Sequence, residues 1–142
     1  MRSKIFLLAT LLFPALSYAC PNLAGTYSCR YGIFSKQIEV TQYDRGGVTT
    51  YQVDGGGEIS ADGIRHQTPN LHPLLDRHAR NYSYIANCSG DRLDFEGVAD
   101  LVRGGQGDVQ GELIKHGSDL TIHMVLVTPD KTRDITLDCS PR

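Results

Sequence analysis

Between its glycine-rich turns, this chain repeats one pattern in which apolar and polar side chains alternate along short runs. In residues 36–43, Ile38 and Val40 share one side and polar side chains share the other. Successive side chains of a β-strand point to opposite faces, so this alternation is typical of a half-buried sheet. The same alternation recurs in four later runs, at residues 81–88, 91–99, 120–127 and 133–139.

Tight turns separate these runs. Asp54-Gly55-Gly56-Gly57, Asp62-Gly63 and Thr128-Pro129-Asp130 are examples. Gly, Asp and Pro suit turns because they supply a positive φ, a side-chain bond to the backbone or a fixed φ. Short strands at this spacing indicate an antiparallel barrel or sandwich. We predict an all-β fold, an antiparallel up-and-down barrel of eight or nine strands.

Residues 64–80 break the pattern. This segment holds Pro69 and Pro73 and shows no alternation. Proline is well placed in the first turn of a helix, so we predict a long loop that contains a short helix starting near Pro73. Long loops in small domains are often functional, and this one could act as a lid over the barrel.

The first 19 residues have the features of a cleavable export signal. Arg2 and Lys4 precede an apolar run at residues 5–16, and Ser17-Tyr18-Ala19 places small residues at the positions that signal peptidase needs. The alternative is a buried N-terminal helix. We predict a signal peptide at residues 1–19 and an exported protein, either periplasmic or extracellular.

Removing this signal leaves 142 − 19 = 123 residues, the size of one domain, at residues 20–142. The formal charge of this part is 12 − 16 = −4. A nucleic-acid-binding protein calls for a clustered basic surface, so nucleic acid is not an expected partner. No later stretch reaches the roughly 20 apolar residues of a transmembrane helix.

All four cysteines follow the predicted cleavage site, and an even number in an exported chain indicates disulfides. Acylation of Cys20 would leave one thiol unpaired, so a lipid anchor is the disfavoured alternative. Four cysteines allow three pairings. We prefer to join Cys20 and Cys29 to Cys88 and Cys139 rather than to each other, because closing a barrel brings the first strand beside the last.

The start of the mature chain carries a short motif. Asn22-Leu23-Ala24-Gly25-Thr26-Tyr27 resembles the first signature of the lipocalins and their calycin relatives, with tyrosine in place of tryptophan. The resemblance implies an eight-stranded barrel that Tyr27 plugs at its closed end. The family also has an arginine near the end of the last strand. Here Arg133 lies at the start of that predicted strand and Arg142 is the final residue.

A second resemblance overlaps the first. Tyr27-Ser28-Cys29-Arg30-Tyr31-Gly32, followed by a predicted strand, looks like the opening of the periplasmic inhibitors of c-type lysozyme. It too implies an exported, disulfide-bonded antiparallel barrel. The Ser-Gly-Ser-Gly-Ala-x-Tyr-like segment of the inhibitory loop is missing from this sequence.

Three histidines in the irregular segment are candidates for metal binding or catalysis. His66, His72 and His78 recur every six residues, with Asp76 between the last two. Metal ligands usually have closer spacings, and no G-x-S-x-G motif accompanies these histidines. Solvated loop residues explain them equally well. We therefore expect no metal, no cofactor and no catalytic residues.

The tyrosines are the other candidates for binding. Tyrosine combines apolar area with a hydroxyl, which suits either a semi-polar cavity or a well-packed core. For a ligand in the barrel mouth, the predicted contacts are Tyr51, Tyr82, Tyr84, His72 and His78.

Three functions follow, in order of preference. The first is a non-catalytic binding protein that holds a small apolar or amphipathic ligand in a lipocalin-like barrel. The second is a protein-binding module, such as an inhibitor of a secreted hydrolase, that uses exposed loops and tyrosines. The third is a hydrolase with a loop histidine as its base. A filled barrel interior would favour the second function over the first.

Overall fold

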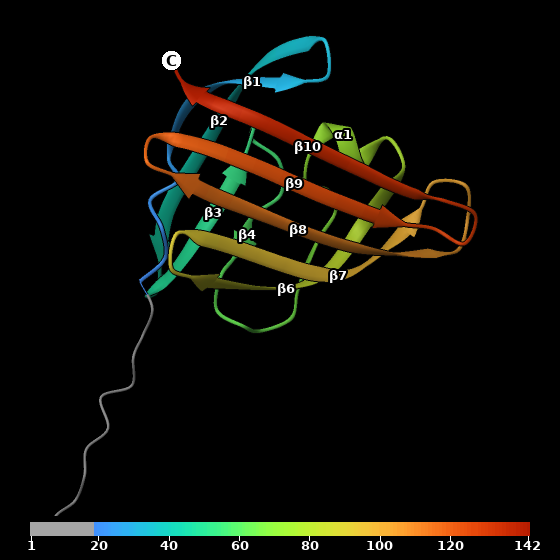
Figure 1. The fold of residues 1–142 in the computed structure, drawn as a ribbon. Coiled ribbons are helices and arrows are strands. Elements are labelled where there is room, and N and C mark those ends of the chain that lie inside the picture. Colours follow the sequence, from blue (N-terminus) through green and yellow to red (C-terminus); the bar gives the residue numbers. More distant parts are fainter. Residues whose placement is uncertain (1–18) are drawn as a thin grey trace, which may run out of the picture.

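Ten antiparallel strands follow one another around a nearly closed barrel (Figure 1). The computed structural model describes residues 19–142, so the predicted signal peptide, except for its last residue, lies outside the described residues. The short helix α1 (Pro73–Asp76) lies between β5 and β6. The strands are β1 (Gly25–Tyr31), β2 (Phe34–Arg45), β3 (Val48–Val53), β4 (Ile59–Ser60), β5 (His66–Thr68), β6 (Ala79–Ser89), β7 (Arg92–Leu101), β8 (Gln106–His116), β9 (Asp119–Val127) and β10 (Thr132–Pro141).

The all-β antiparallel barrel is confirmed, although it has ten strands rather than eight or nine. The extra strands, β4 and β5, are two and three residues long, too short to show alternation. Strand β5 lies inside 64–80, which was predicted to form only a loop and a helix. The short helix does form there, and Pro73 occupies its first turn as predicted.

The strand order places the first strand beside the last. The sheet runs β4-β3-β2-β1-β10-β9-β8-β7-β6-β5, so the open seam lies between β4 and β5. One side chain spans this seam. The Tyr84 hydroxyl donates to the Glu58 carbonyl at 2.8 Å and accepts from the Ser60 amide at 2.9 Å. These two bonds, each contributing on the order of 1 kcal/mol, connect the two edges where the ladder is interrupted.

The predicted inward faces are confirmed. In β2, Ile38 and Val40 are buried while their neighbours are exposed. The same agreement holds in the later strands because a two-residue period leaves only one choice of face. Their buried side chains include Tyr82, Tyr84, Ala86, Leu93, Phe95, Ala99, Leu120, Ile122, Met124, Leu126, Ile135 and Leu137.

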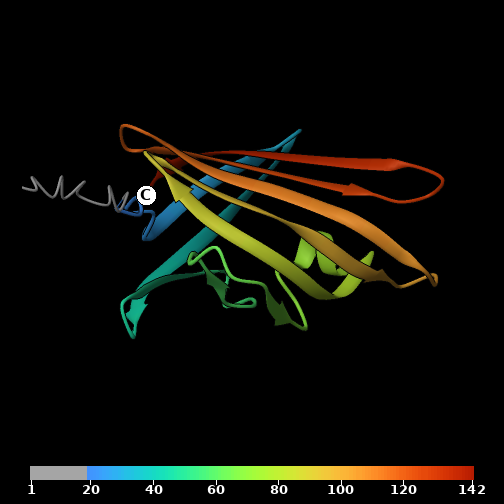
Figure 2. The ribbon, with the colours of Figure 1, turned by 90° about the horizontal axis from the view of Figure 1, so that it is seen from below.

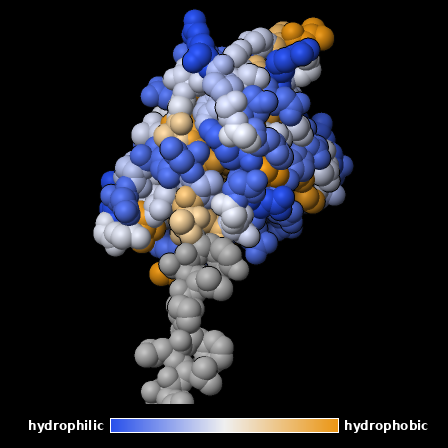
Figure 3. Space-filling view, turned by 60° about the vertical axis from the view of Figure 1, so that its left-hand side comes forward, coloured by the Kyte–Doolittle hydropathy of each residue, from blue (hydrophilic) through white to orange (hydrophobic). Residues whose placement is uncertain are grey.

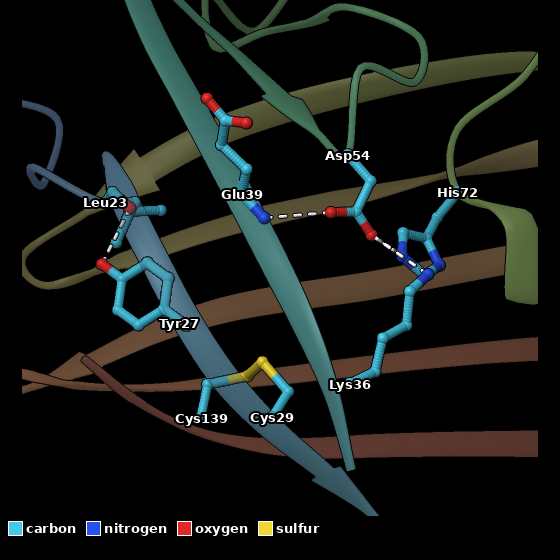
Figure 4. Close-up of a disulfide and its surroundings, with 8 residues drawn as sticks. All are labelled: Leu23, Tyr27, Cys29, Lys36, Glu39, Asp54, His72 and Cys139. Atoms are coloured by element: carbon cyan, nitrogen blue, oxygen red, sulfur yellow. Dashed lines mark hydrogen bonds and ion pairs between the residues drawn. A yellow bond between two sulfur atoms is a disulfide. The ribbon is translucent and has the colours of Figure 1, made fainter. Parts of the chain in front are cut away.

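Both disulfides join an N-terminal cysteine to a later one, as predicted. Cys29 and Cys139 are direct partners in the β1–β10 ladder, where their bridge joins positions 110 residues apart (Figure 4). Cys20 pairs with Cys88 near the end of β6, 68 residues away. Two disulfides are compatible with an exported protein.

The four strands β7–β10 form one side of the barrel. Seen from below, the long strands β7–β10 lie on one side and β1–β3 cross them on the other (Figure 2). Helix α1 lies toward the end where the β7–β8 and β9–β10 turns meet. Leu71 and Leu75 of the α1 region are buried in the same hydrophobic core as the strands. Among residues 19–142, no helix is long and apolar enough to cross a bilayer.

Candidate functional site

The predicted ligand-binding tyrosines lie inside the barrel. Tyr51, Tyr82 and Tyr84 are at most 1% exposed, and Tyr27 is 2% exposed. Each hydroxyl has a partner in the protein, as a buried phenol requires. Tyr51 donates to the Pro21 carbonyl at 2.7 Å, and burial raises its pKa to about 12. These tyrosines pack in the interior of the barrel, and their hydroxyls are already hydrogen-bonded to protein atoms. The hydroxyls are therefore not free to bind a ligand.

A polar junction attaches the α1 region to the barrel wall (Figure 4). Asp54 has a positive φ of 53°, and its side chain accepts from the Glu39 amide at 2.9 Å. The second carboxylate oxygen lies 3.2 Å from Nε2 of His72 and 3.3 Å from Nζ of Lys36. His72 is 3% exposed and caps α1, because its Nδ1 accepts from the Leu74 amide. With both ring nitrogens engaged, His72 is a structural residue in this geometry.

The burial of His72 predicts a loss of stability in mild acid. Burial lowers its pKa below the ordinary 6.5, although Asp54 opposes this. Below pH 6.5 the unfolded chain therefore binds a proton that the folded chain does not, and the free energy of unfolding falls as the pH is lowered. Urea unfolding at pH 7.5 and 5.5 should show this fall. His72→Gln should reduce the difference between the two pH values, and the control His116→Gln, at an exposed position at the end of β8, should reduce it less. An unchanged difference in His72→Gln would contradict the assignment.

The other two loop histidines lie apart from His72 and from each other. His66 Nε2 is 2.9 Å from the Asp62 carboxylate, and its ring lies against that of Tyr84 at 5.9 Å between centroids. His78 lies in a surface cleft beside Arg77. Within residues 19–142, no group of three or more His, Cys, Asp or Glu side chains is placed to hold a metal ion. The three histidines therefore do not converge on one centre.

The β1–β2 hairpin ends in an exposed apolar tip, formed by Tyr31, Ile33 and Phe34. These side chains are 41%, 95% and 69% exposed, respectively. The hairpin lies at the upper edge of the barrel in Figure 1, and a hydrophobic group stands at the same height in Figure 3 on an otherwise largely hydrophilic face. The Cys29–Cys139 bridge, two residues before Tyr31, cross-links β1 to β10. The three exposed side chains therefore project from a strand that is cross-linked to its neighbour, and we call them the hairpin tip.

A cleft with basic walls lies beside the hairpin tip. Its larger part has a volume of about 560 Å³ and is formed by the end of the α1 region and by the β7–β8 and β9–β10 turns. A smaller part of about 290 Å³ reaches Tyr31. We call this the cationic cleft, defined by Arg77, His78, Arg103, Lys131 and Arg133. Both parts share all of these residues except Arg103.

Another cleft, of about 440 Å³, lies on the outer face of β6–β9. Three of its ionisable side chains, Asp94, Glu112 and His123, take part in ion pairs. His123 Nε2 lies 2.8 Å from Asp134, and Glu112 lies 3.5 Å from both Arg92 and His123. Cross-strand pairs of opposite charge stabilise a sheet by up to about 1 kcal/mol each. This network therefore has a structural explanation.

Of the five predicted ligand contacts, only His78 lies in the cationic cleft, and none lies in the hairpin tip. Tyr51, Tyr82, Tyr84 and His72 are in the interior. The hairpin tip and the arginines were missed by the sequence analysis. A signal for the tip was present, because Ile33 and Phe34 stand at a turn, where polar residues are usual. The arginines gave no comparable signal, since they come from separate segments of the chain.

Neither the known protein-family models nor the curated proteins contain a match to this chain.

Proposed function

We propose that this protein is an exported, non-catalytic binding module that docks onto a partner protein through the hairpin tip. The observation that carries the proposal is the exposure of Ile33 and Phe34, at 95% and 69%, on a hairpin fixed by a disulfide. Large apolar side chains exposed together mark interaction sites on soluble proteins. A hairpin whose first strand is cross-linked to β10 has less conformational entropy to lose on binding, so more of its burial contributes to affinity.

The filled lumen supports a surface site over a site inside the barrel. A lipocalin-like ligand needs an open interior, but Tyr27, Tyr51, Tyr82 and Tyr84 are fully buried there with hydroxyls bonded to protein atoms. A small apolar ligand would have to displace these side chains and break their hydrogen bonds. The partner we favour is a folded protein with an apolar cleft, such as the active-site groove of a secreted hydrolase.

The partner can be trapped from the native compartment. A photo-crosslinking amino acid at position 34 should give one dominant protein adduct, whereas the same group at position 64 should not. Ile64 is a matched control because it is 62% exposed but lies in the β4–β5 connection, away from the hairpin. If the partner is a hydrolase, its activity with and without this protein then shows whether binding inhibits it.

The trapped partner, once purified, allows a direct affinity measurement. Burying Ile33 and Phe34 contributes roughly 1.5–3 kcal/mol each, so the double variant Ile33→Ser/Phe34→Ser should bind about 100-fold more weakly or worse. Ile64→Ser should bind like the wild type. All three proteins should unfold at the same temperature, because these side chains are exposed. Equal affinities for the double variant and the wild type would refute the proposal, as would a co-purifying lipid mass in place of a protein partner.

A further inference from the structure

The cationic cleft gathers positive charge that the rest of the molecule does not neutralise. Within residues 19–142, the side chains of Arg77, Arg103, Lys131 and Arg133 form no ion pair. The larger part of the cleft contains one carboxylate, Asp130, which gives a local formal charge of 4 − 1 = +3. The whole chain has a net charge of −2, so the cleft is locally opposite to its protein.

The fold brings these cations together from three directions. Arg77 follows α1, Arg103 lies in the β7–β8 turn, and Lys131 and Arg133 belong to the β9–β10 turn and the start of β10. The two carboxylates nearby are already engaged. Asp130 accepts from the Thr128 hydroxyl at 2.9 Å, and Asp134, in the smaller part of the cleft, is bonded to His123 at 2.8 Å.

His78 lines the cleft together with these four cations. Burial lowers its pKa, and the nearby charges of Arg133, Lys131, Arg77 and Arg103 lower it further. Its backbone is fixed, since the amide donates to the Leu75 carbonyl at 2.9 Å and the carbonyl accepts from the Val102 amide at 3.0 Å. His78 is therefore a neutral hydrogen-bonding group among permanent cations at neutral pH.

We propose that the cationic cleft is a binding site for a phosphate group that carries two or more negative charges. Guanidinium groups present paired N–H donors that match phosphate oxygens, and three arginines line this cleft. A single carboxylate would neutralise only one of the three excess charges, whereas a phosphate monoester or diphosphate neutralises more. The inference does not depend on the hairpin tip, because none of the five residues that define the cleft belongs to it.

The same chemistry occurs in soluble phosphorylated molecules and in the headgroups of anionic phospholipids. The volume of about 560 Å³ holds a phosphate together with part of the molecule that bears it. Leu101 and Val102 add apolar surface to the wall beside the cations. The experiment must therefore distinguish a free phosphate compound from a lipid surface.

Isothermal titration with inorganic pyrophosphate in 150 mM NaCl tests the site. The wild type should bind saturably with one site per chain. Arg103→Gln and Arg133→Gln should each weaken binding about tenfold or more, since each removes a charge-assisted contact. Arg45→Gln makes the same charge change at the end of β2, outside the cleft, and should leave the affinity unchanged.

NMR titration of His78 gives a second measure. The charged groups that line the cleft with His78 are the cations Arg77, Arg103, Lys131 and Arg133 and the carboxylates Asp130 and Asp134. Bound pyrophosphate should raise the pKa of His78, because the anion offsets the positive charge of these cations.

Vesicles of phosphatidylcholine with phosphatidic acid then distinguish a lipid headgroup from a soluble phosphate. Binding to them that depends on Arg103 and Arg133 supports a lipid headgroup, and pyrophosphate binding without vesicle binding supports a soluble phosphate. No saturable binding of either, or equal weakening by Arg45→Gln, overturns the proposal.

Discussion

Serine in place of both Cys29 and Cys139 is expected to lower the free energy of unfolding by about 4–5 kcal/mol. The bridge closes a segment with a sequence separation of 110, and the loss of loop-closure entropy in the unfolded chain is about this large for such a loop. Since the whole stability of a domain is usually 5–15 kcal/mol, the variant should be only marginally folded. Urea unfolding of the oxidised proteins, followed by circular dichroism, measures the loss.

The second bridge provides the comparison. Cys20 and Cys88 are 68 residues apart, so the same entropy argument gives about 4 kcal/mol for Cys20→Ser/Cys88→Ser. The two variants should therefore be similarly destabilised despite their different settings in the fold. A loss below about 1 kcal/mol for Cys29→Ser/Cys139→Ser would mean that the β1–β10 ladder keeps the barrel closed without the bridge.

Gly97→Ala is expected to destabilise the barrel by about 3 kcal/mol or more. A β-carbon at this position would lie 1.9 Å from the Ser83 carbonyl oxygen and 2.8 Å from the α-carbon of Tyr84. Both atoms belong to the backbone of β6, so a rotamer change cannot relieve the overlap. The strands would have to separate, and overpacking of this kind usually costs 1–3 kcal/mol or more.

Gly46→Ala is the matched control for this prediction. Gly46 has a φ of +59° but nothing within 4 Å of an added β-carbon, so only the left-handed backbone opposes alanine, at about 1–2 kcal/mol. Urea unfolding of both variants separates the two effects. If the losses were equal, the contact between Gly97 and β6 would not be the cause.

The β6–β7 ladder also contains an irregularity next to this close contact. The register of this pair shifts between Arg80 and Ser83, and Asn81 adopts a positive φ of 54°. The Asn81 side chain donates to Asp100 at 3.1 Å across the irregularity. A bulge turns the strand and sharpens its twist, which suits the curvature of a barrel wall.

The sequence was most informative where one period controls a whole strand. Alternation in the run that contains Ile38 and Val40 predicted which side chains are buried, because a strand has only two faces. The preference for joining the N-terminal cysteines to later ones followed from the same prediction, since a closed meander places β1 next to β10, but the choice between Cys88 and Cys139 as the partner of each was left open. The first inference depends on alternation within a single strand, and the second depends on closure of the antiparallel sheet into a barrel.

The site was harder to predict because its residues are combined by the fold. Arg77 and Arg103 belong to different turns, and each alone is an ordinary surface residue. Conversely, Tyr51 and Tyr84 were assigned to a ligand because tyrosine suits both a cavity and a core, and composition does not distinguish these. Strands β4 and β5 are defined by pairing with longer neighbours, so their own few residues carry no period.

Because β4 and β5 are the two edges of the sheet, the chain could be connected in another order without breaking a strand pair. The C-terminal residue lies beside the start of β1, because the Arg142 amide donates to the Thr26 carbonyl at 3.1 Å. A circularly permuted chain, joined by a linker that spans the distance from residue 142 to residue 20 and opened near Gly63, would keep every pair of hydrogen-bonded strands. In that order the polypeptide would trace the sheet from one edge to the other without interruption. Strands β1 and β10 thus lie in the middle of the sheet, and the segment between β4 and β5 connects its two edges.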